Sequence, residues 1–296
     1  MASNRVFLAT KAMFFCRRTY VEVCSFRRKS PNFVFQKKSL MEKSRYISWF
    51  KVQKMWGRVD LQWEKINEDV NILVGINGCG KTTLLNLMAD YYAGVHIKKG
   101  IATAVSGTEV ESPVTYIRSF DVPANAKRKT ESLLLQELKH IINQNGEGTS
   151  FFDYRMKMLN FPEEAATIQK RIGQFFQAVN ALFQETKKEI AIDPLRNRLI
   201  FRLQGGKADI QLEQLSSGEK QMLLILTTVF LQEEKPNILL MDEPEISLHI
   251  TWQDRLVGMI RQLNPNCQLI LTTHSPNIFA NGWEDKIVFI EDLESR

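Results

Sequence analysis

Residues 70–83 read VNILVGINGCGKTT, in which a short apolar run leads into a glycine-rich loop and then a Lys-Thr-Thr sequence. The run VNILVG is typical of a buried strand, and KTTLLNLMADYYAG continues with helical spacing. Residues 75–82 fit the pattern G-x-x-x-x-G-K-[ST] in the strand–loop–helix context that this motif requires. The glycines allow backbone N–H groups to surround a β-phosphate, Lys81 reaches the β- and γ-phosphates, and the Thr82 hydroxyl ligates Mg²⁺. The stretch therefore predicts a site for ATP and Mg²⁺ between a buried strand and a helix.

The same loop supplies most of the residues that we expect to hold the nucleotide. These predicted cofactor-binding residues are Gly75, Asn77, Gly78, Cys79, Gly80, Lys81, Thr82 and Thr83. Cys79 has two interpretations, a redox-sensitive handle or a small residue that fills a tight loop, and we favour the second.

A second candidate site follows another apolar run, ILLMDE, at residues 238–243. Asp242 would hold the Mg²⁺ shell, and Glu243 could orient and deprotonate the attacking water. Alone, such an acidic pair is weak evidence, because many strands end in solvated acids, but the glycine-rich loop needs such a partner. His274, just past the apolar run QLILTT, could contact the γ-phosphate. The predicted catalytic residues are therefore Lys81, Glu243 and His274, and the predicted metal ligands are Thr82 and Asp242.

A polar turn with one glycine, QLSSGE at residues 214–219, opens an apolar segment with helical spacing. The first N–H groups of a helix lack partners and lie at the positive end of the helix dipole, so they suit an anion. The chain therefore contains two candidate phosphate-binding turns.

In this order, GINGCGKTT, LSSGEKQ, LLMDEPE and TTHS resemble the ABC-type ATPases, and in particular their OLD, RecF and Rad50-like group, whose members are often defence-associated. In that family the signature turn docks onto the γ-phosphate held by a second copy, so two ATP molecules lie inside a head-to-tail dimer. The resemblance implies that Ser216 and Gly218 contact ATP in trans and that the chain forms an ATP-dependent homodimer. Glu219 replaces the usual glutamine, as in the Rad50- and SMC-like branches.

The chain also departs from better-known branches of that family. Transporter subunits usually have an aspartate where this chain has His249, and the segment between Lys81 and Ser216 lacks the long coiled-coil arm of Rad50 or SMC. Only a short segment follows His274, without room for the C-terminal TOPRIM nuclease of full OLD enzymes, so we expect any nuclease or toxin output on another polypeptide. No Q-loop glutamine is assigned. Trp49, Trp56 and Trp63 could each stack on adenine, but buried strand aromatics explain them equally, and none is assigned.

The composition is that of an ordinary globular chain. Its 296 residues, 44% hydrophobic and 24% charged, suffice for one large domain or two small ones with ample core. No apolar run is long enough to cross a bilayer, which argues against an integral membrane protein. Four scattered cysteines without CxxC spacing suggest neither disulfides nor zinc and favour a reducing, cytoplasmic location.

The formal net charge of +6 comes from one end of the chain. Residues 1–40 contain nine Lys and Arg residues against one acid, so the remaining residues are slightly acidic. Bulk charge therefore does not indicate a nucleic-acid partner, although it leaves one possible. This leader, which contains Cys16 and Cys24, could be a transit-like peptide, a basic tail or translated sequence upstream of a true start at Met41. We favour a disordered tail or a mis-assigned start.

Strand and helix patterns alternate after the leader. Residues 46–63 predict antiparallel strands around a Trp56-Gly57 turn, and residues 198–214 predict a hairpin that turns at Gly205-Gly206. Residues 247–262 predict one helix. A longer helix is predicted over residues 162–190, with acids near its start and Lys187 and Lys188 near its end to complement the dipole. Its apolar stripe is Ile168, Ile172, Phe175, Val179 and Leu182.

The stripe could bind a partner coil, but we favour burial within its own lobe. Strands that alternate with helices imply a parallel sheet with crossovers. The predicted fold class is therefore α/β, a P-loop NTPase of ABC-ATPase type with a mixed sheet core, an antiparallel β subdomain and an inserted helical lobe. The predicted domains are the leader, residues 1–40, and an ABC-type ATPase domain, residues 41–296, with the helical insertion at about residues 125–190.

The sequence as a whole predicts an Mg²⁺-dependent ATPase that forms an ATP-sandwiched dimer and regulates a separate effector protein or a nucleic-acid process. Bacterial anti-phage defence is one setting, by analogy alone. One alternative is the ATP-binding subunit of an ABC transporter, which His249 and the helical insertion disfavour. Others are a RecF- or Rad50-like DNA-repair ATPase and a protein that binds ATP without turnover, against which the Glu243 carboxylate argues.

Overall fold

The structure is a computed structural model that describes residues 43–98, 100–120, 131–143, 150–193, 198–206 and 209–295. The predicted leader, with Cys16, Cys24 and Met41, lies outside the described residues. The segment 121–130, which follows the strand after which we sought a Q-loop glutamine, also lies outside them. The description concerns the unit that begins at Met41.

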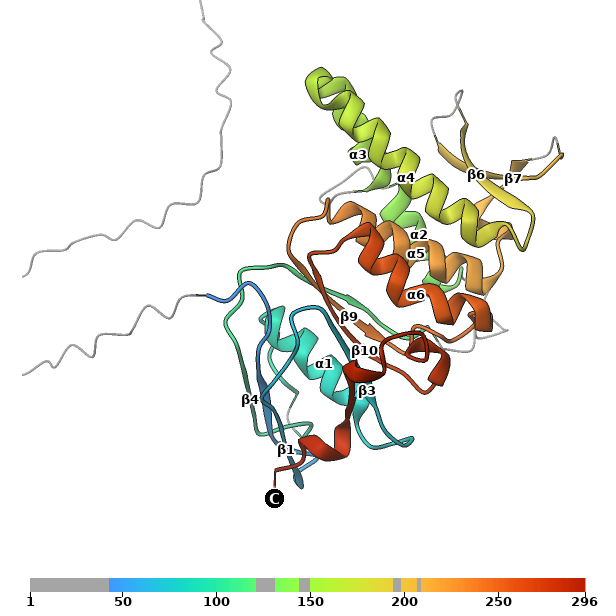
Figure 1. Cartoon of the computed structure of the whole chain (residues 1–296). Coiled ribbons are helices and arrows are strands. Elements are labelled where there is room, and N and C mark those ends of the chain that lie inside the picture. The colour runs from blue at the N-terminus through green and yellow to red at the C-terminus, as the bar shows by residue number, and fades with distance from the viewer. Residues whose placement is uncertain are drawn as a thin grey trace, which may run out of the picture. The chain divides into compact units, whose positions relative to one another are not determined.

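A five-stranded parallel sheet forms the centre of this unit (Figure 1). Its strands, in spatial order, are β11 (Ile287–Phe289), β3 (Val70–Val74), β10 (Cys267–Thr272), β9 (Asn237–Asp242) and β5 (Val114–Ile117). Every residue of β9 and β10 is buried, and four of the five residues of β3 are. Strands covered on both faces have no solvent side, which explains why these three appear in the sequence as continuous apolar runs.

One face of the central sheet packs on α1 (Lys81–Tyr92) and on a small antiparallel sheet. That sheet has the order β2-β1-β4, and its strands are β1 (Phe50–Met55), β2 (Val59–Trp63) and β4 (Ala104–Gly107). Ile238 and Leu240 of β9 point to this side, and the residues between and after them, Leu239 and Met241, point to the other. Figure 1 shows α1 between the two sheets.

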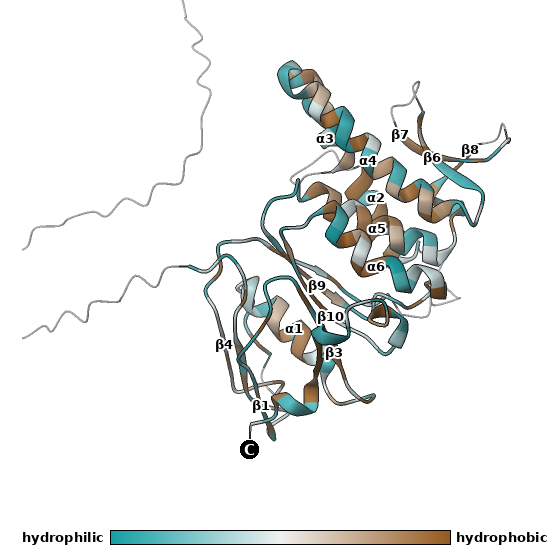
Figure 2. Ribbon diagram, in the orientation of Figure 1, coloured by the Kyte–Doolittle hydropathy of each residue, from teal (hydrophilic) through white to brown (hydrophobic). Residues whose placement is uncertain are grey.

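The opposite face is covered by α5 (Ser217–Leu231) and α6 (Ile250–Leu263), and a helical lobe packs on these helices. The lobe contains α2 (Leu133–Asn143), α3 (Phe151–Asn160), a short 3₁₀ turn η1 (Pro162–Glu164) and α4 (Ala165–Phe183). Phe175 of α4 stacks on Phe230 of α5 with ring centroids 4.7 Å apart, and Phe151 of α3 packs against both rings. Figure 2 shows brown, hydrophobic residues along α4 and α5. The lobe and the face of the central sheet that it covers therefore share one hydrophobic core.

The predicted helix over residues 162–190 is too long. The predicted apolar stripe is buried in the lobe, as we favoured, but α4 ends at Phe183. Lys187 has a positive φ of 54°, and Lys188 begins a strand, so neither lysine lies in a last helical turn. Pairing with the next strand and burial of Ile190 outweigh the helical pattern, because tertiary contacts override local propensity.

That strand belongs to a third, antiparallel sheet, made of β6 (Lys188–Asp193), β7 (Arg198–Leu203) and β8 (Asp209–Ile210). The predicted hairpin over residues 198–214 is present as β7 and β8, with Gly205 at a positive φ of 77°. Its second strand is shorter than predicted, since η2 (Leu212–Gln214) follows it, and β6 was not predicted. The remaining 3₁₀ turns are η3 (Pro276–Ile278), η4 (Glu284–Lys286) and η5 (Ile290–Leu293).

The helix predicted from Ser247 begins later, at Ile250. Ser247 has a positive φ of 70°, and His249 caps the helix because its Nδ1 accepts a hydrogen bond from the Thr251 N–H at 3.4 Å. Parallel and antiparallel strands therefore occupy separate sheets, beside the predicted helical lobe. Within the described residues, every helix is too short or too polar to span a bilayer.

Candidate active site

The carboxyl ends of three neighbouring strands form the candidate site. The glycine-rich loop follows β3, Asp242 ends β9 and Thr272 ends β10. Thr272 lies in register with Asp242 on one side and with Leu73 on the other. Because parallel strands end at the same edge, the loop, the acidic pair and the residues after β10 converge there.

Two glycines in the loop lie against neighbouring side chains. A Cβ on Gly80 would lie 2.7 Å from Met55 Cε, and its φ of +105° already disfavours other residues. A Cβ on Gly75 would lie 2.7 Å from Ile290 Cγ2. The buried Lys81 ammonium donates to the Gly75 and Ile76 carbonyls at 3.0 and 3.1 Å. The loop therefore surrounds a fixed positive charge, as a phosphate site requires.

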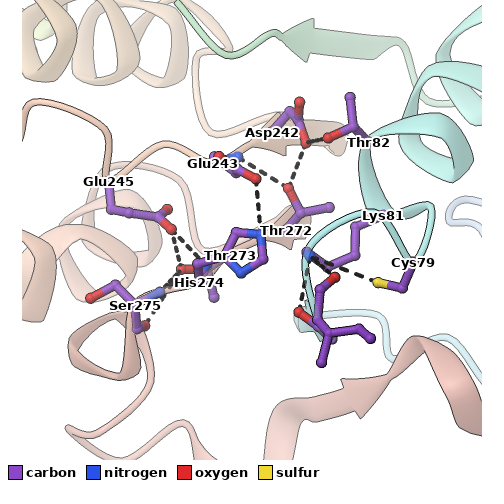
Figure 3. Close-up of polar contacts among 12 residues, drawn as sticks. Cys79, Lys81, Thr82, Asp242, Glu243, Glu245, Thr272, Thr273, His274 and Ser275 are labelled. Atoms are coloured by element: carbon purple, nitrogen blue, oxygen red, sulfur yellow. Dashed lines mark hydrogen bonds and ion pairs between the residues drawn. The ribbon is translucent and has the colours of Figure 1, made fainter. Parts of the chain in front are cut away.

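The Asp242 carboxylate joins the loop helix to the strands. Its Oδ1 accepts hydrogen bonds from Thr82 Oγ1 at 3.0 Å and from Thr272 Oγ1 at 2.7 Å (Figure 3). A carboxylate and a hydroxyl are hard oxygen donors that fit Mg²⁺, which usually takes few protein ligands and completes its shell with water and phosphate. The described part of the chain has no cluster of three or more His, Cys, Asp or Glu side chains that could hold a metal.

Glu243 and His274 contact each other at the same edge. His274 Nε2 lies 3.2 Å from Glu243 Oε1, and both side chains are partly exposed. Burial raises the pKa of the Glu243 carboxyl above its ordinary value; His274 opposes this shift, and the Asp242 and Glu245 carboxylates add to it. A carboxylate with a raised pKa is a stronger base and suits proton abstraction from water.

An open pocket of about 600 Å³ lies between these groups and is lined by Trp56, Asn77, Gly78, Gly80, Lys81, Thr82, Thr83, Glu243 and His274. Of the predicted site residues in and around the loop, Gly75, Cys79 and Asp242 do not line this pocket. Trp56 is 44% exposed, and its ring would be 2.9 Å from a Cβ on Gly80, whereas Trp63 is buried in the core. Of the three tryptophans considered for adenine, the pocket is lined by Trp56 alone among the described residues.

The signature turn of this chain, residues 215–219, does not line this pocket. Ser216 is the N-cap of α5: its Oγ accepts from the Glu219 N–H, and the Glu219 carboxylate accepts from the Ser216 N–H at 2.8 Å. Ser216 is exposed, whereas Gly218 is buried against the loop after β9. A Cβ on Gly218 would lie 2.5 Å from the Ser247 carbonyl oxygen, so this position requires glycine.

Lys188 of β6 forms an ion pair with Glu219 of the signature turn. The sequence did not predict this contact. The Lys188 ammonium lies 2.8 Å from both carboxylate oxygens of Glu219, whose side chain is 1% exposed. Burial alone would raise the pKa of Glu219, but hydrogen bonds from Lys188, the Ser216 N–H and Thr186 outweigh burial and hold it below its ordinary value. Glu219, the residue in place of the usual glutamine, is therefore a buried cap of the turn.

Three further residues near the site were not predicted. Thr272 bonds Asp242, Glu245 bonds the backbone of His274, and Gln221 of α5 bonds the Pro244 carbonyl. Thr272 and Glu245 lie inside the quoted motifs TTHS and DEPE, so motif position was a usable signal for them. Gln221 is the last residue of the quoted motif LSSGEKQ, but that motif gives no indication of its partner, the Pro244 carbonyl.

Comparison with known families and proteins identifies the family of this chain. Residues 117–280, more than half of the chain, match the family described as "AAA domain, putative AbiEii toxin, Type IV TA system". The chain belongs to this family. The matched residues include the signature turn, the acidic pair and His274 and begin after the glycine-rich loop at residues 75–82. Together with the relatives and the solved structure described below, this match confirms the predicted resemblance to an ABC-like ATPase.

Curated relatives are distant. The chain is 20% identical to the Septu protein PtuA of Bacillus thuringiensis, over 72% of this chain and 67% of that protein. It is 25% identical to the "Retron Vc95 probable ATPase" of Vibrio cholerae, over 57% of this chain but only 32% of that protein. It is also 25% identical to the "Putative hemin import ATP-binding protein HrtA" of Staphylococcus aureus, over 75% of this chain and 82% of that protein. The predicted resemblance to the defence-associated ATPases is thereby confirmed.

A solved structure supports the fold. An SmcHead, crystallised bound to the C-winged helix domain of ScpA, matches with a TM-score of 0.52 and 16% sequence identity, over 82% of this chain and 93% of that one. The predicted ABC-ATPase fold class is therefore confirmed for the AAA domain.

Lys188→Met is expected to lower the free energy of unfolding by about 3 kcal/mol at pH 7, because it leaves the buried Glu219 carboxylate without its cation. The pKa of Glu219 is depressed in the fold, so this contribution is complete above the unfolded pKa and is lost as pH falls through the folded pKa. Urea denaturation of the wild type and of Lys188→Met should therefore show a difference in free energy of unfolding that becomes smaller below about pH 4.5.

Lys187→Met is the matched control, because this neighbouring lysine is exposed and its loss should change stability by less than about 0.5 kcal/mol. If the difference in free energy of unfolding between wild type and Lys188→Met became larger in acid, this would contradict the stabilising role of the Lys188–Glu219 ion pair.

Proposed function

We propose that residues 41–296 form one ATPase domain, with the helical insertion at about residues 125–190, and that it works as an ATP-driven switch. One observation carries the proposal: the three predicted catalytic residues, Lys81, Glu243 and His274, line one pocket with the glycine-rich loop. They come from three different segments of the chain, and only the sheet edge brings them together. The reaction is hydrolysis of the β–γ bond of ATP by water.

Each residue at the edge has a distinct task in this reaction. Lys81 and the loop N–H groups hold the phosphates, with the roles predicted for Gly75, Asn77, Gly78, Cys79, Gly80 and Thr83. Thr82 and Asp242 would hold Mg²⁺, which would neutralise phosphate charge during transfer. Glu243 orients the attacking water and accepts its proton, and His274 orients the Glu243 carboxylate and faces the γ-phosphate.

The site is proposed to be completed by a second copy of the chain. Ser216 and Gly218 would place the N-terminal end of α5 on the γ-phosphate bound by that copy. Support comes from two facts: Ser216 is exposed at a capped helix start, and the turn does not line the pocket of its own chain. Loss of the γ-phosphate would then remove part of the interface, so hydrolysis would open the dimer.

The switch is proposed to control a separate effector protein in the bacterial cytoplasm, with anti-phage defence as its setting. The family description, which includes a toxin and a type IV TA system, and the relatives named for Septu and a retron support this analogy. Nucleic acid stays a possible partner.

A transporter ATPase is the second candidate, favoured by the likeness to a protein named for hemin import. His249, which caps α6, stands where transporter subunits usually have aspartate, and this disfavours it. Co-purification of the chain with a membrane permease would support the transporter.

Trp56→Ala is expected to raise the Kd for ATP about tenfold, because stacking of a base on an aromatic ring contributes about 1–3 kcal/mol. Isothermal titration with ATP measures this change, and inorganic tripolyphosphate, which has no base, should bind both proteins equally. Trp49→Ala is the control, because Trp49 does not line the pocket. Equal affinity of wild type and Trp56→Ala for ATP would show that Trp56 does not stack on the adenine base.

Glu243→Gln tests the proposed function itself. The wild type should release phosphate from ATP with Mg²⁺, and the variant should bind ATP but lose most of its turnover, since an amide cannot accept the proton. The variant should therefore accumulate as an ATP-bound dimer in gel filtration, and Lys81→Ala, which should not hold the nucleotide, should stay monomeric. If Glu243→Gln remained monomeric at saturating Mg-ATP, this would argue against the ATP-sandwiched dimer.

A further inference from the structure

The loop between β9 and α6 contains a buried carboxylate that the proposed reaction does not use. Glu245 is 8% exposed, and its Oε1 accepts hydrogen bonds from Thr273 Oγ1 at 2.7 Å and from the His274 N–H at 2.8 Å (Figure 3). Its Oε2 is buried without a hydrogen-bond partner among the residues that the structure describes. Because a buried oxygen without a partner lowers stability, stability alone does not explain this residue.

These bonds act on the residue that faces Glu243. The His274 imidazole lies 3.2 Å from the Glu243 carboxylate, while its backbone N–H is held by Glu245. The next residue is also fixed, since the Ser275 N–H donates to Thr273 Oγ1 at 2.9 Å and Ser275 Oγ donates to Gln253 of α6 at 2.6 Å. The backbone that carries the imidazole is thus held at three successive residues.

The loop between β9 and α6 also contacts α5, the helix that begins at the signature turn. Gln221 Nε2 of α5 donates to the Pro244 carbonyl at 2.8 Å in a buried contact. One turn earlier in α5, Gly218 lies against the Ser247 carbonyl with no space for a side chain. Residues 244–247 therefore connect the start of α5 to the backbone of His274 through short, buried contacts.

We propose that Glu245 is a positioning residue that holds His274 against Glu243 and links this pair, through residues 244–247, to the signature turn of the same chain. The inference rests on the proposed ATPase function, since it concerns how the same site is arranged. It predicts an effect on turnover that is separate from nucleotide binding, because the Glu245 side chain does not line the pocket that holds the loop phosphates.

The test measures kcat and KM for ATP hydrolysis together with the Kd for ATP in the full chain. Glu245→Ala should lower kcat about tenfold or more, because a displaced group loses its catalytic alignment, and should leave the Kd for ATP within about twofold of wild type. Glu245→Gln keeps an oxygen that accepts the same two hydrogen bonds, so it should restore kcat to within about threefold of wild type. Titration with ATP counts the binding-competent sites, and kcat is expressed per such site.

Each other outcome has a clear meaning. A wild type without ATPase activity refutes the proposed function, whereas an active wild type with unchanged kcat in Glu245→Ala overturns this inference alone. A Gln variant as slow as the Ala variant also overturns it, because the two hydrogen bonds would then not be the cause. If Glu245→Ala does not fold, Thr273→Val takes its place, which removes one of the two Glu245 bonds together with the bond from the Ser275 N–H. A lower kcat at unchanged Kd supports the inference, and an unchanged kcat overturns it.

Discussion

The parallel register of β3, β10 and β9 is the constraint on which the rest of the structure depends. It aligns Thr272 with Asp242, and the two hydroxyls that bond Asp242, from Thr272 and Thr82, join the strands to the glycine-rich loop. A shift of one residue along either strand would turn these side chains to the other face of the sheet and separate the loop from its acidic pair. Both faces of these strands are buried against apolar residues, so the pairing lies inside the core.

The parts of the site that the sequence predicted are those that a contiguous motif specifies. The glycine-rich loop, the acidic pair and His274 each follow an apolar run, and parallel strands bring the ends of such runs together. The fold class could be predicted for the same reason. Gly80 shows why the motif has glycine here, since its φ of +105° strains other residues and the Met55 and Trp56 side chains lie close to it.

The parts that were missed depend on pairings between distant segments. Lys188 was placed in a helix because the pattern before it was helical, yet its strand pairs with β7 and its ammonium reaches Glu219. The choice among the three tryptophans depended on which one lies beside Gly80, and spacing gave no information on that. Gln221 and Glu245 likewise found their partners only in the folded chain.

In the proposed dimer, the two halves of the site are formed separately in each chain. The pocket contains the loop, the acid and the histidine, and the signature turn is capped, ion-paired and held against residues 244–247 without lining that pocket. A turn built so rigidly, yet with Ser216 exposed, suits docking onto a second copy, since little order must be created on binding.

Mixing two variants tests this composite site most directly. Lys81→Ala removes phosphate binding in its own chain and leaves its signature turn intact, whereas Ser216→Arg blocks the turn and leaves its own pocket intact. Each variant alone should be inactive, with ATP binding retained by Ser216→Arg, and their mixture should regain ATPase activity, because a mixed dimer contains one complete site. Full activity of Ser216→Arg alone, or no activity in a mixture shown to contain mixed dimers, would contradict the account.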